Sequence, residues 1–151
     1  KYIKNHTENN YIIAPHELHH ISDLQKQTDA LLYSKANQEN ILTTNVLIID
    51  SIGLLSNIYQ YGKLAYIGGG FGSGIHNILE AATFGLPVIF GPNYQKFNEA
   101  KELITQKGAI SISNYGELTS AINYFNTFDK KIATDYIDTN RGATRSIIEH
   151  I

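Results

Sequence analysis

Short apolar runs alternate with longer amphipathic stretches along the chain, after ten mostly polar residues that we expect to be a frayed entry. The apolar runs predict six short strands, at Tyr11–Ala14, Ala30–Tyr33, Val46–Ile49, Leu64–Ile67, Pro87–Phe90 and Ala109–Ile112. The stretches between them predict helices at His19–Gln27, Ile52–Tyr61, His76–Phe84, Gln95–Gln106, Tyr115–Phe125 and roughly Lys130–Ile151. Uniformly apolar strands that alternate with helices are typical of an α/β fold. We predict a Rossmann-like, doubly wound parallel sheet of about six strands with helices on both faces.

Composition narrows the class of protein. The 151 residues fit one domain, and a hydrophobic share of 42% is enough to bury a core. The charged share of 17% is too small for a disordered tail. The net charge of −2 gives no field that would attract nucleic acid or an anionic membrane. We therefore expect no nucleic-acid partner, and any bound anion must be held by local groups.

Four absences are also informative. The chain has no cysteine, which excludes disulfides and thiolate metal sites. We recognise no signal peptide at its start and no apolar run near the ~20 residues that span a bilayer. It has no methionine, so we expect it to be a piece of a longer protein.

Four loops are candidates for ligand binding, because doubly wound folds bind ligands at the carboxyl ends of their strands. These loops are Pro15–His20, Asp50–Gly53, Gly68–His76 and Gly91–Phe97. The sequence concentrates its glycines, histidines and prolines in them. Such a concentration is what a binding site requires, although turns alone also favour Gly and Pro.

The most distinctive loop runs from Gly68 to Gly74, where every residue except Phe71 is Gly or Ser. It leaves a predicted strand and enters a predicted helix near Ile75. Glycine lets a ligand approach the backbone N–H groups closely, and a helix N-terminus adds unpaired donors and a partial positive charge. The loop therefore predicts an anion site, most naturally for phosphate. The alternative is a flexible loop without a ligand.

Two other nucleotide-binding motifs fit poorly. The G-x-G-x-x-G spacing of nicotinamide domains fails at Ser73 when counted from Gly68, and at Ile75 when counted from Gly70. The loop also follows the fourth predicted strand instead of the first. No Gly-Lys-Ser/Thr occurs, so a Walker-type phosphate loop is absent.

The segment after the glycine loop carries polar groups suited to a nucleotide. We expect His76 and Asn77 in the first turn of the following helix, with Glu80 one turn later on the same face. A carboxylate at this position can accept two hydrogen bonds from a vicinal diol such as a ribose. The alternative is a surface charge that favours the helix N-terminus.

Residues 16–20 spell His-Glu-Leu-His-His and match the H-E-x-x-H motif of zinc proteases. Those enzymes place the motif within a long helix, whereas here it directly follows a predicted strand. No convincing third ligand follows, so we predict no metal site. His16 and Glu17 are candidates for a ligand-facing loop, and His19 and His20 are expected on a helix surface.

These residues together resemble a known family. The resemblance rests on Asp50–Gly53, Tyr59, Leu64–Phe71, His76–Ala82, Gly85–Pro92 and Phe97. This combination is similar to the carboxy-terminal domain of the 3-deoxy-D-manno-octulosonic acid (Kdo) transferases, which are GT-B-type glycosyltransferases. The resemblance implies that residues 1–151 form one half of a GT-B fold and bind the nucleotide sugar CMP-Kdo.

The resemblance also implies a set of donor-binding residues: His16, Ser51, Ile52, Gly53, Gly68, Gly69, Gly70, Phe71, Gly74, His76, Asn77, Glu80 and Lys96. The glycine loop would hold the CMP phosphate, and Glu80 would bind the ribose. Residues 51–53 would lie along the cytosine or ribose, and residues 76 and 77 would face the phosphate or sugar. Lys96 would neutralise the phosphate or the Kdo carboxylate. Many relatives carry Arg in place of His16 and Ser in place of Gly70.

The implied activity is transfer of Kdo from CMP-Kdo to a lipid A precursor in lipopolysaccharide synthesis, at the cytoplasmic face of the bacterial inner membrane. The acceptor, the membrane contact and the catalytic base would belong to an amino-terminal domain outside this chain. We therefore expect a soluble fragment with no catalytic residue, no metal and no cofactor of its own. The alternatives are a GT-B donor domain for a UDP-sugar, or a non-catalytic nucleotide-binding module.

Overall fold

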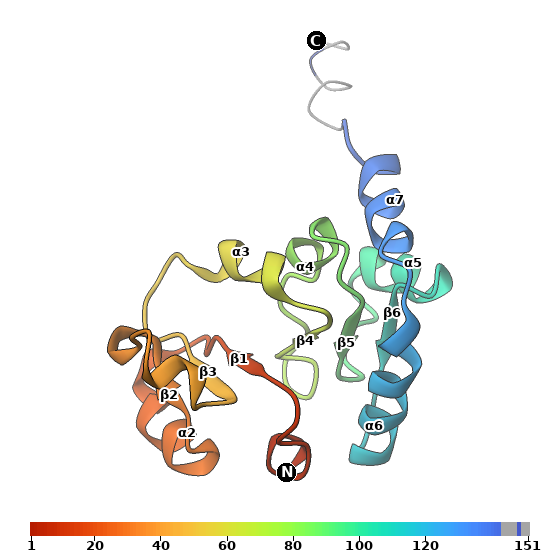
Figure 1. The fold of residues 1–151 in the computed structure, drawn as a ribbon. Helices are drawn as coiled ribbons and strands as arrows, with labels where there is room; N and C mark the ends of the chain where they lie inside the picture. The colour runs from red at the N-terminus through yellow and green to blue at the C-terminus, as the bar shows by residue number, and fades with distance from the viewer. Residues whose placement is uncertain (143–147, 149–151) are drawn as a thin grey trace. The chain divides into compact units, whose positions relative to one another are not determined.

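The structure is a computed structural model that describes residues 1–142 and residue 148. The chain forms two compact units, residues 1–57 and 58–151, and each contains a parallel sheet with helices (Figure 1). The predicted last helix, Lys130–Ile151, is observed as α7 (Lys131–Thr139). Most of the predicted helix beyond residue 142 lies outside the described residues.

The first unit contains α1 (Tyr2–Asn5), β1 (Tyr11–Ile13), α2 (Ile21–Thr28), β2 (Leu31–Leu32) and β3 (Val46–Ile48). The three strands are parallel and lie in the order β1-β3-β2. One face of this sheet is buried, with Ala30, Val46 and Ile48 at the centre of its core. The short helix α3 (Leu55–Ile58) contains the last residues of this unit and the first residue of the next.

The chain entry is more ordered than the polar composition predicts. Residues 2–5 form α1, and the ring of Tyr2 stacks on His6 with centroids 4.0 Å apart. The hydroxyl of Tyr11 donates to the carbonyl oxygen of His6 at 2.9 Å. These aromatic and hydrogen-bond contacts hold the entry against β1, so the prediction of a frayed segment is wrong.

The second unit contains the strands β4 (Ala65–Ile67), β5 (Val88–Phe90) and β6 (Ala109–Ser111) and the helices α4 (Leu79–Thr83), α5 (Asn98–Thr105), α6 (Tyr115–Tyr124) and α7. Its strands are parallel in the order β4-β5-β6. The central strand β5 is fully buried on both faces. Val88 and Phe90 pack in the cluster that includes α4, α5 and α7, and Ile89 packs in the cluster that includes α6.

The α/β class and the parallel strands are confirmed. The six strands form two hydrogen-bonded sheets of three, where the sequence predicted one sheet of about six. The predicted helix Ile52–Tyr61 begins only at Leu55, because Gly53 has a φ of +90°, which a helix does not accommodate. No helix among the described residues is long and apolar enough to cross a membrane.

A buried tyrosine joins two helices of the second unit. The Tyr136 hydroxyl in α7 donates to a carboxylate oxygen of Glu102 in α5 at 2.8 Å. Burial, and then the hydrogen bond to Glu102, raise the pKa of Tyr136 to about 12. The neutral phenol is therefore the form that the fold stabilises.

We predict that Tyr136→Phe lowers the free energy of unfolding by about 1–2 kcal/mol, because it removes a hydrogen bond to a charged group. The folded pKa of about 12 exceeds the usual tyrosine pKa of 10.0, so this contribution is present below pH 10 and is lost as the pH rises through about 12. Urea unfolding at several alkaline pH values measures both effects. Tyr124→Phe is the matched control, because this exposed tyrosine should change stability by less than about 0.5 kcal/mol. An unchanged stability of Tyr136→Phe would contradict the prediction.

Candidate functional site

The glycine loop leaves the carboxyl end of β4 and folds back on itself. The N–H groups of Gly72 and Gly74 both donate to the carbonyl oxygen of Gly69, at 2.8 and 3.3 Å. The N–H of His76 donates to the carbonyl oxygen of Gly68 at 3.1 Å. Gly69 and Gly74 have φ values of +84° and +148°, which favour glycine. The loop is therefore held in a defined conformation by its own backbone.

A second loop, Gly91–Phe97, follows β5 and forms a wall of the site. The backbone N–H of Asn93 donates to the carbonyl oxygen of Gly70 at 2.9 Å. The side-chain amide of Asn93 donates to the carbonyl oxygen of Gly72 at 2.7 Å. Sequence reasoning placed this loop at the site but missed Asn93. The Gly-Pro-Asn sequence after a buried strand signals a turn, but it does not signal that the partners of Asn93 lie in another loop.

The two loops approach each other through two glycines. A Cβ placed on Gly91 would lie 2.5 Å from the carbonyl carbon of Gly70, and one placed on Gly70 would lie 2.6 Å from the nitrogen of Gly91. Neither position accommodates a side chain in this conformation. The backbone of Gly91 thus fills the space that a side chain at position 70 would need.

The tip of the glycine loop presents backbone N–H donors. Phe71 and Ser73 are exposed, and no described residue accepts a hydrogen bond from their N–H groups. The N–H groups of Gly72, Gly74 and His76 are already bonded within the loop. The N–H groups of Phe71 and Ser73 are therefore available to an anion at the tip of the loop.

The helix after the loop starts later than predicted. Four residues separate Gly74 from α4, so the prediction of a helix that begins at His76 is wrong. Ile75 and Ile78 are buried in the core and anchor this segment, which leaves His76 and Asn77 exposed between them. His76 is consequently not one helical turn before Glu80.

Asn77 is instead the direct partner of Glu80. Its side-chain oxygen accepts from the N–H of Leu79 at 3.0 Å, and its amide nitrogen donates to Oε1 of Glu80 at 2.9 Å. No described residue hydrogen-bonds to Oε2 of Glu80. The carboxylate is thus oriented by one oxygen and can accept a hydrogen bond from a ligand at the other. Burial raises the pKa of Tyr59, and the negative charge of Glu80 raises it further.

The remaining predicted residues of the first unit lie after β1 and β3. His16 is exposed, and the Ser51–Gly53 turn is exposed as well, with Ile52 at 88%. Asp50 fixes the start of this turn, because it accepts hydrogen bonds from the N–H of Ser34 at 2.9 Å and from the Ser34 hydroxyl. The bond from the hydroxyl holds the pKa of Asp50 below its usual value.

Within the second unit the glycine loop contacts the Gly91–Phe97 loop, and the joined pair Asn77 and Glu80 follows the glycine loop in the chain. Phe97 lies against Gly74, since a Cβ on this glycine would be 3.1 Å from the ring. Lys96 is exposed in the same wall and has no ion-pair or hydrogen-bond partner among the described residues. The donor-binding roles of these side chains stay predictions.

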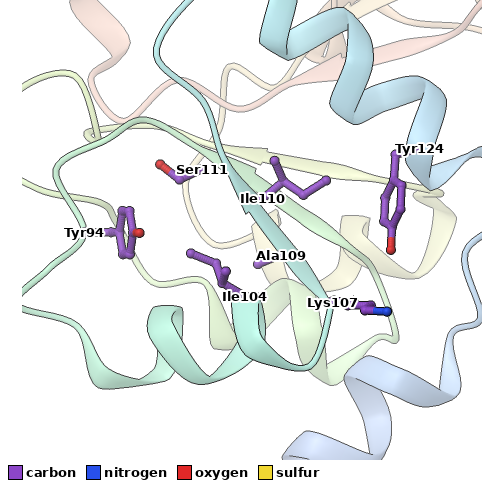
Figure 2. A pocket seen from close by; sticks show the side chains of 7 residues that line it. All are labelled: Tyr94, Ile104, Lys107, Ala109, Ile110, Ser111 and Tyr124. Carbon is purple, nitrogen blue, oxygen red and sulfur yellow. The ribbon is translucent and has the colours of Figure 1, made fainter.

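The second unit also has a hollow of about 310 Å³ along β6. Figure 2 shows the seven side chains that line it: Tyr94, Ile104, Lys107, Ala109, Ile110, Ser111 and Tyr124. None of the predicted donor-binding residues is among them. The hollow is therefore a feature of the outer strand and not of the glycine loop.

Comparison with known proteins tests the resemblance. No family model matches the chain. It is 31% identical over 126 residues to the 3-deoxy-D-manno-octulosonic acid transferase of Aquifex aeolicus (strain VF5), which covers 82% of this chain. It is 32% identical over 139 residues to that of Rickettsia prowazekii (strain Madrid E), which covers 86% of this chain. The fold matches the C-terminal CMP-Kdo binding domain of WaaA from Acinetobacter baumannii with a TM-score of 0.74.

The predicted resemblance to the carboxy-terminal domain of the Kdo transferases is confirmed. The chain spans 35% of the length of the Aquifex Kdo transferase and 28% of that of the Rickettsia enzyme. The structural match covers 93% of this chain and 78% of the Acinetobacter domain at 18% sequence identity, and it shows a shared fold.

We predict that Gly91→Ala destabilises the second unit by about 1–3 kcal/mol, because the new methyl group would collide with the backbone of Gly70. Gly72→Ala in the glycine loop is the matched control, since a Cβ there meets only the Gly69 oxygen, at 3.5 Å. It should change stability by less than about 0.5 kcal/mol. Chemical unfolding of both variants measures the difference. Equal stabilities would show that the two loops do not touch as described.

Proposed function

We propose that this chain is the donor-binding domain of a glycosyltransferase that transfers Kdo from CMP-Kdo to a lipid A precursor. The Kdo transferases to which it is similar share about a third of its residues over most of its length. The Acinetobacter domain with the same fold is described as a CMP-Kdo binding domain. Both observations support a nucleotide sugar as the ligand.

The arrangement of the glycine loop and Glu80 carries this proposal. A nucleotide monophosphate needs donors for its phosphate and acceptors for its ribose hydroxyls. The N–H groups of Phe71 and Ser73 are donors at the loop tip. The oxygen Oε2 of Glu80 is an acceptor on the same polypeptide stretch, and Asn77 fixes the orientation of its carboxylate. The two kinds of group required by CMP thus occur within ten residues of one another.

The same groups suit the chemistry of transfer. When the bond between Kdo and CMP breaks, negative charge develops on the departing phosphate. Fixed N–H donors and nearby cations stabilise such a leaving group, and they act best when they are already in position. Lys96 supplies a cation in the wall beside the loop. The base that activates the acceptor, the acceptor site and the attachment to the inner membrane belong, in this proposal, to segments outside these 151 residues.

We predict that CMP raises the melting temperature of the chain and that UDP at the same concentration raises it less. Ligand binding to the folded state stabilises by RT ln(1 + [L]/Kd), so the shift reports affinity. Sodium phosphate at matched ionic strength controls for unspecific anion effects. A larger shift with UDP would favour a transferase of UDP-sugars. No shift with either nucleotide would contradict a donor-binding function.

We predict that Glu80→Ala weakens CMP binding by about 1–3 kcal/mol, because the ribose hydroxyls lose a charged acceptor. Isothermal titration calorimetry gives the affinity of each variant. Asp135→Ala is the matched control, because it removes an exposed carboxylate from α7, far along the chain from the loop. If Glu80→Ala and Asp135→Ala bind CMP equally well, Glu80 has no role in holding the ribose.

A further inference from the structure

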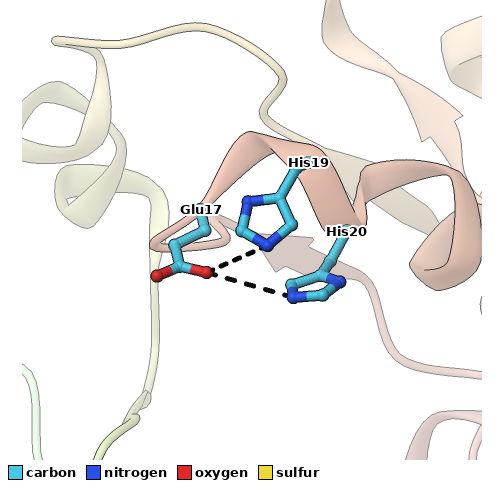
Figure 3. A group of neighbouring side chains, drawn as sticks. All are labelled: Glu17, His19 and His20. Carbon is cyan, nitrogen blue, oxygen red and sulfur yellow. Dashed lines mark ion pairs between the residues drawn. The ribbon is translucent and has the colours of Figure 1, made fainter.

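The segment between β1 and α2 brings three metal-binding side chains to one point. Glu17 has an extended backbone, with φ of −122° and ψ of 125°, and a 3-10 turn at Leu18–His20 follows it. This change of direction returns the Glu17 carboxylate to the two histidines at the end of the turn. Figure 3 shows both rings with a nitrogen directed at the same carboxylate.

The distances between the nitrogen and oxygen atoms of these three side chains are close to those between the ligand atoms of one metal ion. Oε2 of Glu17 lies 3.2 Å from Nε2 of His19 and 3.9 Å from Nε2 of His20. The three donor atoms all lie within 4.8 Å of one another. A zinc ion holds nitrogen and oxygen ligands at about 2.0–2.2 Å, so neighbouring ligand atoms are roughly 3–3.5 Å apart. Small side-chain rotations would bring these three atoms to that separation.

The contacts within this cluster do not give every side chain a hydrogen bond. The 3.9 Å separation between Glu17 and His20 is beyond a hydrogen bond, and the structure gives His20 no hydrogen bond to another described residue. The rings of His19 and His20 nevertheless lie with their centroids 3.9 Å apart. A cation between the three donor atoms would hold all of them, whereas the carboxylate alone bonds closely to one.

We propose that Glu17, His19 and His20 bind a divalent transition-metal ion such as Zn²⁺. Imidazole with one carboxylate suits zinc, nickel or copper, whereas magnesium and calcium prefer oxygen ligands alone. All three side chains are more than half exposed, so an ion reaches the site from solvent and no charge has to be buried. Three protein ligands leave further coordination positions for water or another molecule.

These three proposed metal ligands differ from the two histidines that bind zinc in an H-E-x-x-H motif. In a helix, His16 and His20 would share one face and Glu17 would act as a base. Here the ligand set is Glu17, His19 and His20, and it excludes His16. His19 and His20 are exposed, as expected for helix-surface residues, and they lie in the 3-10 turn. The site is a binding site on a turn and does not have the geometry of a zinc protease.

Calorimetric titration of the untagged chain with ZnCl₂, in a buffer that does not chelate zinc, tests the proposal. We expect binding of one ion per chain and no comparable heat with MgCl₂. His19→Gln and His20→Gln should each weaken zinc binding on the order of tenfold or more, since each removes one of three protein ligands. Circular dichroism of each variant shows whether the fold is retained.

His16→Gln is the matched control, because this histidine is exposed in the same segment but lies outside the cluster. It should bind zinc as the unchanged chain does. Two results would overturn the proposal: unchanged affinity in the double variant His19→Gln/His20→Gln, or loss of binding in His16→Gln with retention in His20→Gln. Imidazole resonances in NMR spectra provide a second readout, since those of His19 and His20 should shift on addition of zinc and those of His6 should not.

Discussion

The backbone contact between Gly70 and Gly91 sets the geometry of the second unit's candidate site. Neighbouring parallel strands end at the same edge of a sheet, so the loops that follow β4 and β5 have to pass each other there. They pass at a distance that leaves no room for a side chain on either glycine. The close approach allows Asn93 to donate to both Gly70 and Gly72, and these bonds fix the loop tip.

Core packing determines the orientation of the polar groups that follow. Ile75 and Ile78 are buried three residues apart, and the two residues between them have to face solvent. The Asn77 side chain then takes the place of a helix cap, because it accepts from the N–H of Leu79 while it donates to Glu80. The Glu80 carboxylate is thus positioned by the buried side chain of Ile78 and by the side-chain amide of Asn77.

The elements that packing determines could be predicted from the sequence, whereas the details of the site could not. All six apolar runs contain a strand of a parallel sheet, and the central run Val88–Phe90 is buried on both faces. The predicted starts of two helices were less accurate. The positive φ of Gly53 delays one helix, and the hydrogen bond from the N–H of Leu79 to the Asn77 side chain marks the start of the other, and hydrophobic periodicity encodes neither feature. Asn93 was missed because its partners are more than twenty residues away in the sequence.

The first unit shows why a motif has to be interpreted through its backbone. The letters His-Glu-Leu-His-His match a protease motif only if a helix places residues 16 and 20 on one face. The strand β1 ends at Ile13, and the extended conformation of Glu17 prevents a helix from forming before the 3-10 turn. The same conformation brings the carboxylate to residues 19 and 20. Local backbone conformation therefore determines which side chains converge. The same holds for the glycine loop, because its internal hydrogen bonds occupy some backbone N–H groups and leave others for a bound molecule.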